Sequence, residues 1–305
     1  MCDKFWVSQR GLLVAFLFVL TWCASRTAWA QTLNWEGQTG VFVTPFAYVA
    51  PSSESFGAPV FAYHYLDAGS VIGGFHQLSI TDGAFHRVEF GYTRSIHQDG
   101  TSVFSSLWSD GFNAFHAKVN FLAENTGGRK RLPALSAGFV VRSQVRNVGG
   151  VMQGKDTTNA DFYVVATKTV TRVRQLPMVF NFGCKATNAS LLGLAGNAPD
   201  YSARLFGSAA FVLKGPAKSS IFLAAEALQE PRHLEGLPSA SIPTTLAYAV
   251  RFVPAGSFPS LHHGWGEAQP KLSIDIGVAQ VAGTIEPGVN LDARHQLAIG
   301  VSYQF

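Results

Sequence analysis

The sequence of 305 residues predicts an all-β fold, a transmembrane antiparallel up-and-down β-barrel of about 12 strands, with about 14 strands as the alternative. Three observations predict it. Many stretches alternate apolar with polar or small residues at a period of two, which gives a strand one apolar and one polar face. Charged residues make up only 14% of the chain, yet after residue 21 no apolar run approaches the ~20 residues of a membrane helix. Finally, short and long connections alternate along the chain, as they do between the strands of membrane barrels.

The first 30 residues predict a secretory signal peptide. Lys4 and Arg10 precede an apolar run over residues 11–21, and an Ala-x-Ala cleavage site ends at Ala30. Cys23 leaves a lipoprotein site as an alternative. We therefore expect domains at 1–30 (signal peptide), 31–58 (an N-terminal segment) and 59–305 (the barrel).

Loss of the signal peptide changes the charge and the cysteine count. Residues 1–30 contain three of the basic residues, one acidic residue and two of the three cysteines. The remaining chain is close to neutral, so the basic isoelectric point gives no indication of nucleic-acid binding. Cys184 alone remains, which excludes an intrachain disulfide and a site of several thiolate ligands. We expect no cofactor and no nucleic-acid partner.

The segment 31–58 contains the run T-G-V-F-V-T-P-F-A. Pro45 argues against a central strand, because proline cannot donate a ladder hydrogen bond. We expect the segment to be an extra strand or a piece inside the lumen. The run resembles the start of barrel families associated with exopolysaccharide export, in which T-G-x-x-x-T-P-x-A precedes the first strands. The matching residues are Thr39, Gly40, Thr44, Pro45 and Ala47.

Alternating stretches then follow one another to the end of the chain. Most have about 8–13 residues, near the ~9–11 that a tilted strand needs to cross a bilayer. Asp82-Gly83 predicts a tight hairpin turn between the second and the third strand. The predicted strands are 60–66, 71–81, 85–97, 112–123, 135–143, 162–171, 178–186, 201–213, 221–228, 244–253, 272–279 and 294–305.

The last strand carries the clearest alternation. One face consists of Leu297, Ile299, Val301, Tyr303 and Phe305. A strand that stops on Phe, with a second aromatic two residues earlier, resembles the terminal strand of bacterial outer-membrane β-barrels, where it is the assembly signal. The resemblance implies the outer membrane of a Gram-negative bacterium as location, after cleavage near Ala30. It also implies membrane lipid, lipopolysaccharide and the barrel-assembly machinery as partners.

Connection lengths are consistent with this resemblance. With Phe305 in the periplasm, the turns that start at residues 82, 124, 172 and 215 fall on the periplasmic side and are short. The loops that start at residues 98, 147, 188, 229 and 282 fall on the outer side and are longer. The connection 254–270 does not fit, because it is long and on the periplasmic side.

The second face of each strand is polar and is predicted to line an enclosed lumen. Its charged, imidazole and amide members are Arg87, Glu89, His116, Lys118, Asn120, Arg142, Lys185, Arg204, Glu226, Arg251 and Asp275. Basic residues outnumber acidic ones in this set, which predicts a modest preference for anions if the lumen is open. The alternative is that the charges pair and plug a narrow barrel.

Aromatic side chains recur toward the strand ends, and Tyr and Trp prefer the boundary between headgroups and acyl chains. We expect such a belt from Tyr48, Tyr63, Tyr65, Tyr92, Trp108, Tyr163, Tyr201, Tyr248, Tyr303 and Phe305.

No motif for chemistry is found. There is no G-x-S-x-G nucleophile motif, and His262-His263 has no third metal ligand in spacing. We predict no catalytic, cofactor-binding or metal-binding residues. The expected function is a passive channel or a structural or export-associated barrel that is not an enzyme, with small anionic solutes or polysaccharide as candidate cargo. Two alternatives stay open: an outer-membrane lipid hydrolase and a secreted soluble β-protein that binds a ligand.

Overall fold

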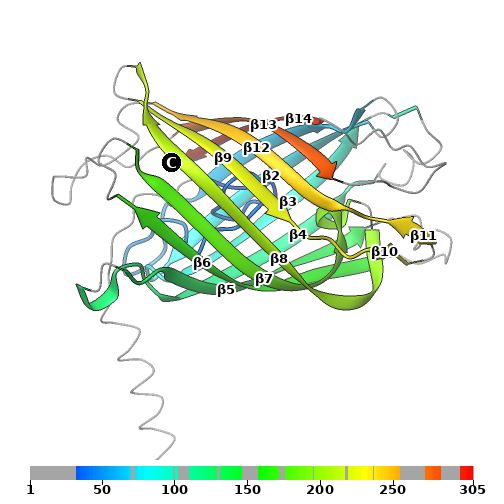
Figure 1. Ribbon diagram of the computed structural model, residues 1–305, viewed down its shortest axis with the longest axis horizontal. Helices are drawn as coiled ribbons and strands as arrows, with labels where there is room; N and C mark the ends of the chain where they lie inside the picture. The colour runs from blue at the N-terminus through cyan, green and yellow to red at the C-terminus, as the bar shows by residue number, and fades with distance from the viewer. Residues whose placement is uncertain are drawn as a thin grey trace, which may run out of the picture.

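Twelve antiparallel strands pair edge to edge and close into a barrel in the computed structural model (Figure 1). The first and last strands of the barrel join over seven residue pairs, from Val60–Gln304 to Leu66–Ala298. Closure leaves no open sheet edge, which hydrocarbon requires because unpaired backbone groups there cost several kcal/mol each, about as much as burying any unbonded amide. The predicted fold class is confirmed.

The structure describes residues 32–69, 73–98, 100–101, 110–128, 131–145, 157–171, 176–194, 196–216, 219–235, 237–254, 272–282 and 296–304. The predicted signal peptide lies outside these residues, and the predicted domain boundaries remain predictions. Within the described residues, no helix has the length and apolar character needed to cross a membrane.

The barrel strands are β1 (Val60–Asp67), β2 (Gly74–Ala84), β3 (Val88–Gln98), β4 (Phe112–Leu122), β5 (Ala134–Val145), β6 (Thr157–Val170), β7 (Met178–Ser190), β8 (Gly196–Lys214), β9 (Ser220–Leu228), β12 (Thr244–Val253), β13 (Leu272–Ala282) and β14 (Gln296–Gln304). The connection after β9 contains a separate sheet of β10 (His233–Leu234) and β11 (Leu237–Ser241). We call the end of the barrel at Gln304 the C-terminal rim, and the end at Gln98 the opposite rim.

The turn between β2 and β3 was predicted at Asp82-Gly83, and this prediction is wrong. Both residues belong to β2, and the chain reverses at Phe85 and His86, whose φ angles are 54° and 56°. Gly83 serves a different purpose: a Cβ atom there would lie 2.1 Å from the carbonyl oxygen of Ala50. The glycine lets the N-terminal segment approach the wall, and it was misread as a turn signal.

Two predicted outer loops, 147–160 and 188–200, are shorter than expected. β6 already begins at Thr157, β7 continues to Ser190 and β8 begins at Gly196. The predicted strand starts only at residue 162, but Asp161 pairs with Thr187 in the ladder and is buried inside the barrel. A polar residue is compatible with a strand where that strand lines a polar interior.

The outer surface of the wall is apolar. Outward side chains such as Phe182 and Val164 are 61% and 55% exposed, although they lie in the middle of long strands. In β14, Leu297, Ile299, Val301 and Tyr303 face outward, while Phe305 lies outside the described residues.

The predicted aromatic belt is wrong for two residues. Tyr48 and Tyr163 are only 3% and 5% exposed and lie inside the barrel. Tyr48 belongs to the N-terminal segment, and the ladder turns Tyr163 inward. The other Tyr residues of the set face outward and are half-exposed or exposed, and Trp108 and Phe305 lie outside the described residues.

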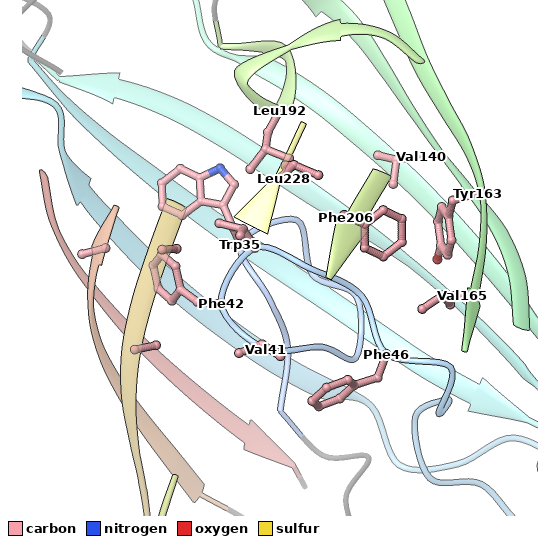
Figure 2. Close-up of a cluster of buried hydrophobic side chains, with 14 of the residues drawn as sticks. Trp35, Val41, Phe42, Phe46, Val140, Tyr163, Val165, Leu192, Phe206 and Leu228 are labelled. Carbon is pink, nitrogen blue, oxygen red and sulfur yellow. The ribbon is translucent and has the colours of Figure 1, made fainter. Parts of the chain in front are cut away.

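Residues 32–50, which we call the lumen segment, lie inside the barrel (Figure 1, blue trace). The segment forms no strand and has only isolated bridges, Leu33–Thr39 and Gly40–Pro45. The alternative of about 14 strands is therefore not observed in residues 32–58. The lumen-segment side chains Trp35, Phe42 and Phe46 join wall residues such as Phe206 in one buried apolar cluster (Figure 2).

Candidate functional site

The candidate site is the interior of the barrel, where polar wall residues meet the lumen segment. Of the eleven side chains predicted to line the lumen, Arg204 on β8 is half-exposed and donates to its neighbour's carbonyl, Ala203 O, at 3.3 Å. The other ten are buried: Arg87, Glu89, His116, Lys118, Asn120, Arg142, Lys185, Glu226, Arg251 and Asp275. Arg87 lies at the C-terminal rim and donates to Asn120 Oδ1 at 3.0 Å.

Glu89 on β3 holds two distant parts of the lumen segment. Its carboxylate accepts hydrogen bonds from the backbone N–H of Thr39 at 3.0 Å and of Ala50 at 2.7 Å, and from the hydroxyl of Thr39. Lys118 on β4 lies 2.9 Å from the same carboxylate and also donates to the carbonyl of Thr39 at 3.2 Å. Both charged side chains are fully buried, so their mutual attraction is little screened by solvent.

Glu226 on β9 binds the backbone of the segment. Phe42 N and Val43 N donate to Oε1 at 2.8 and 3.1 Å, and Thr44 N and Oγ1 donate to Oε2 at 2.7 and 2.6 Å. Successive N–H groups that converge in this way form an anion-binding concavity. Here the anion is supplied by the wall.

Arg251 on β12 binds carbonyl groups of the segment. Its Nη1 donates to Gly40 O at 3.0 Å and its Nη2 to Val41 O at 2.7 Å. Asp275 on β13 receives the guanidinium in a two-point contact, at 2.5 Å from Nε and 3.1 Å from Nη2. The planar fork of arginine makes such simultaneous contacts possible.

An ion cluster lies at the turn of the lumen segment around Glu36. Arg142 on β5 donates from Nε to Glu36 at 2.6 Å and from Nη2 to Asp161 on β6 at 3.0 Å. Lys185 on β7 lies 3.4 Å from the same Asp161 oxygen. Gly37, whose φ is +81°, lets the chain turn beside Glu36.

All five named residues of the T-G-x-x-x-T-P-x-A run bond to the wall. Besides the contacts of Thr39, Gly40 and Thr44, the carbonyl of Pro45 accepts from Asn181 Nδ2 at 2.9 Å, and Ala47 N donates to Thr167 Oγ1 at 2.7 Å. Asn181 and Thr167 were not among the predicted lumen residues, because amides and hydroxyls occur on any polar strand face. Their role depends on the path of the segment.

The connection between β7 and β8 covers the interior near the opposite rim. Leu191 and Leu192 have left-handed φ angles of 49° and 56°, and Leu192 packs into the apolar cluster with Trp35 (Figure 2). Such angles are uncommon for residues other than glycine and cost about 1–3 kcal/mol each. Glu230, which follows β9, accepts the N–H of Leu191 at 3.1 Å, and burial raises its pKa to about 7. Neither feature was predicted.

The polar wall residues hold the lumen segment in place inside the barrel, and the buried histidines His64 and His116 have mainly structural neighbours. His64 has aromatic rings as neighbours, with Trp35 and Phe42 at centroid distances of 6.3 and 6.1 Å. His116 lies 3.5 Å from Thr81 Oγ1. In the part of the chain that the structure describes, no group of three His, Cys, Asp or Glu residues is placed to hold a metal ion.

No protein-family model and no curated protein matches the chain. Among solved structures, it is similar to the KdgM porin (9% identity, 81% of this chain, 99% of that chain, TM-score 0.43) and to the NanC porin (11%, 81%, 100%, 0.43). It is also similar to an outer membrane channel from Pseudomonas putida F1 (11%, 86%, 100%, 0.42).

Proposed function

We propose that the protein is an integral outer-membrane β-barrel and a passive conduit, closed in the described conformation by its lumen segment, without chemistry of its own. One observation carries the proposal: an apolar outer wall encloses a polar interior in which residues 32–50 are bound by many strands. A water-soluble barrel has no use for side chains such as Phe182 at 61% exposure in mid-strand.

The pairing of charges inside the barrel affects which solutes the lumen would attract. Lys118 is paired with Glu89 and Arg251 with Asp275, so the closed lumen offers little net attraction to a solute. Departure of the lumen segment would remove Glu36 from Arg142 and two carbonyls from Arg251. We therefore expect a preference for anionic solutes or acidic polysaccharide only in the open form.

Conductance in a planar bilayer tests the conduit. We expect little or no conductance from the mature chain and regular conductance steps from a variant that lacks residues 32–50. Glu89→Gln combined with Glu226→Gln, which keeps the segment but weakens its binding, should give intermittent openings if the deletion does not fold. Steady conductance of the unaltered protein would contradict closure, and silence of all three in inserted form would contradict a conduit.

Two assays separate the alternatives. A secreted soluble protein would stay dispersed after refolding without detergent, whereas we expect precipitation. A lipid hydrolase would release fatty acids from phospholipid or lipopolysaccharide, whereas we expect none. Fractionation of cells should place the protein in the outer membrane. A structural or export-associated role without solute flux is favoured by the resemblance of the T-G-x-x-x-T-P-x-A run, and it predicts loss of exported polysaccharide in cells that lack the protein.

A further inference from the structure

The outward face of β1–β4 carries a connected group of polar side chains near the opposite rim. Tyr63 on β1 and Gln98 on β3 bracket His76 on β2: the Tyr63 hydroxyl lies 2.7 Å from His76 Nδ1, and Gln98 Oε1 lies 2.7 Å from His76 Nε2. The ring of Tyr65 lies 5.0 Å from the imidazole, centroid to centroid. The imidazole is therefore held from both sides.

A cation lies on the same face, one strand further. The Arg94 guanidinium on β3 donates from Nη1 to Asn113 Oδ1 at 3.2 Å and from Nη2 to the carbonyl of Asp110. Tyr92 donates to the same Asn113 oxygen at 2.6 Å. Arginine has five N–H donors, so a fixed guanidinium with these contacts can still donate to a ligand. We call Tyr63, His76, Arg94, Gln98 and Asn113 the rim patch.

The rim patch lies where an apolar wall meets water. Gln98 is the last residue of β3 and Asn113 the second of β4, while Leu78, Ile96 and Phe115 on the same face are 41–50% exposed. A lipid-facing arginine costs about 2–4 kcal/mol at the midplane of a bilayer and about 0–1 near its surface. The patch therefore suits the level of lipid headgroups, and its arginine suits a phosphate group.

We infer that the rim patch binds the headgroup of a phosphorylated glycolipid, the lipopolysaccharide of the outer leaflet. Arg94 contacts a phosphate group. The Tyr63 hydroxyl and the Gln98 amide, which His76 holds in place, hydrogen-bond to sugar hydroxyls. A phosphoglycerolipid could satisfy the arginine, but it offers fewer hydroxyl groups to Tyr63 and Gln98 than a glycolipid does. The inference rests on the proposed function, because it needs the barrel in the outer membrane with this rim outward.

Binding of purified, detergent-solubilised protein to lipid A tests the inference. Removal of one charge-assisted contact in Arg94→Gln should weaken binding of bisphosphorylated lipid A by about tenfold, and binding of dephosphorylated lipid A much less. His76→Leu should weaken both. Phosphatidylglycerol should bind every variant weakly.

Lys168→Gln is the matched control. Lys168 is a partly exposed cation of β6 near the C-terminal rim, paired with Glu124 at 2.9 Å, and its loss should leave lipid A binding unchanged. Equal losses in Lys168→Gln and Arg94→Gln, or equal binding of phosphatidylglycerol, would overturn the inference. If Arg94→Gln does not fold, Arg94→Lys keeps the charge without the planar fork and should weaken phosphate-dependent binding. Protein that inserts into liposomes but shows none of these differences would refute the lipid site alone, whereas failure to insert would refute the proposed function.

Discussion

The carboxylate of Glu226 accepts both the backbone N–H and the hydroxyl of Thr44, at 2.7 and 2.6 Å, although 182 residues separate the two in the chain. With the N–H groups of Phe42 and Val43, this places one buried acid at the centre of a bend of the lumen segment. Because several donors of the bend converge on this one carboxylate, its replacement should free the bend from the wall. The lumen segment therefore has identifiable anchors.

We expect Glu226→Gln to loosen the segment, since the amide NH₂ would face N–H donors that a carboxylate satisfies. Loss of charge-assisted bonds, each about 1.5–3 kcal/mol, should lower the free energy of unfolding by roughly 3 kcal/mol and speed proteolysis within residues 32–50. Urea unfolding in lipid vesicles and limited proteolysis measure the two effects. Glu54→Gln, at an exposed acid, is the control, and equal behaviour of both variants would exclude Glu226 as an anchor.

Arg142→Met should be costly, because it leaves Glu36 and Asp161 buried without their shared partner. Breaking a buried pair in this way costs about 3–5 kcal/mol in unfolding free energy. Adding Glu36→Gln should recover part of the loss. A double-mutant cycle measures this coupling, and purely additive effects would argue against a direct interaction at the turn of the segment.

Glu230 predicts a pH dependence. Burial raises the pKa of this carboxyl from 4.5 to about 7, so the folded state binds the proton more tightly than the unfolded state does. The contribution to stability is present below pH 4.5 and is lost as the pH rises through 7. Lys185, Asp161 and Arg142 are the charged groups that act on it.

The free energy of unfolding of the unaltered protein, measured in urea, should therefore fall from pH 4.5 to above 7. Glu230→Gln should lack this fall. Glu235→Gln, in the same connection, controls for local disruption. The same pH profile in Glu230→Gln as in the unaltered protein would assign the dependence to another group. The N–H of Leu191 donates to the Glu230 carboxylate and favours its charged form, so this hydrogen bond offsets part of the loss.

Phe182→Arg tests whether lipid touches the wall. Phe182 faces outward in β7, where an arginine should make folding into a bilayer less favourable by about 2–4 kcal/mol. Phe182→Leu should fold almost normally. Folding yield and stability in vesicles measure the difference, and normal insertion of Phe182→Arg would contradict a membrane-facing wall at this level.

Much of the barrel could be predicted from the sequence. Alternation with a period of two is a local property, so all twelve barrel strands, including the one that ends at Gln304, could be placed by residue pattern alone. The predicted turn and strand boundaries were wrong where a residue type that is common in loops occurs within a strand. Gly83 resembles a turn residue but gives room to Ala50, and Asp161 resembles a loop residue but faces a polar interior.

The sequence by itself determined which residues form strands and which side chains share a face, because a strand's alternation needs no information from distant residues. Only the tertiary structure decided that residues 32–50 fill the lumen, and that Glu89, Glu226 and Arg251 hold them there. These contacts join residues from about 40 to more than 200 positions apart, and most involve backbone N–H and C=O groups, which every residue carries. A sequence pattern records side chains, and so it cannot show which backbone groups a buried charge will meet.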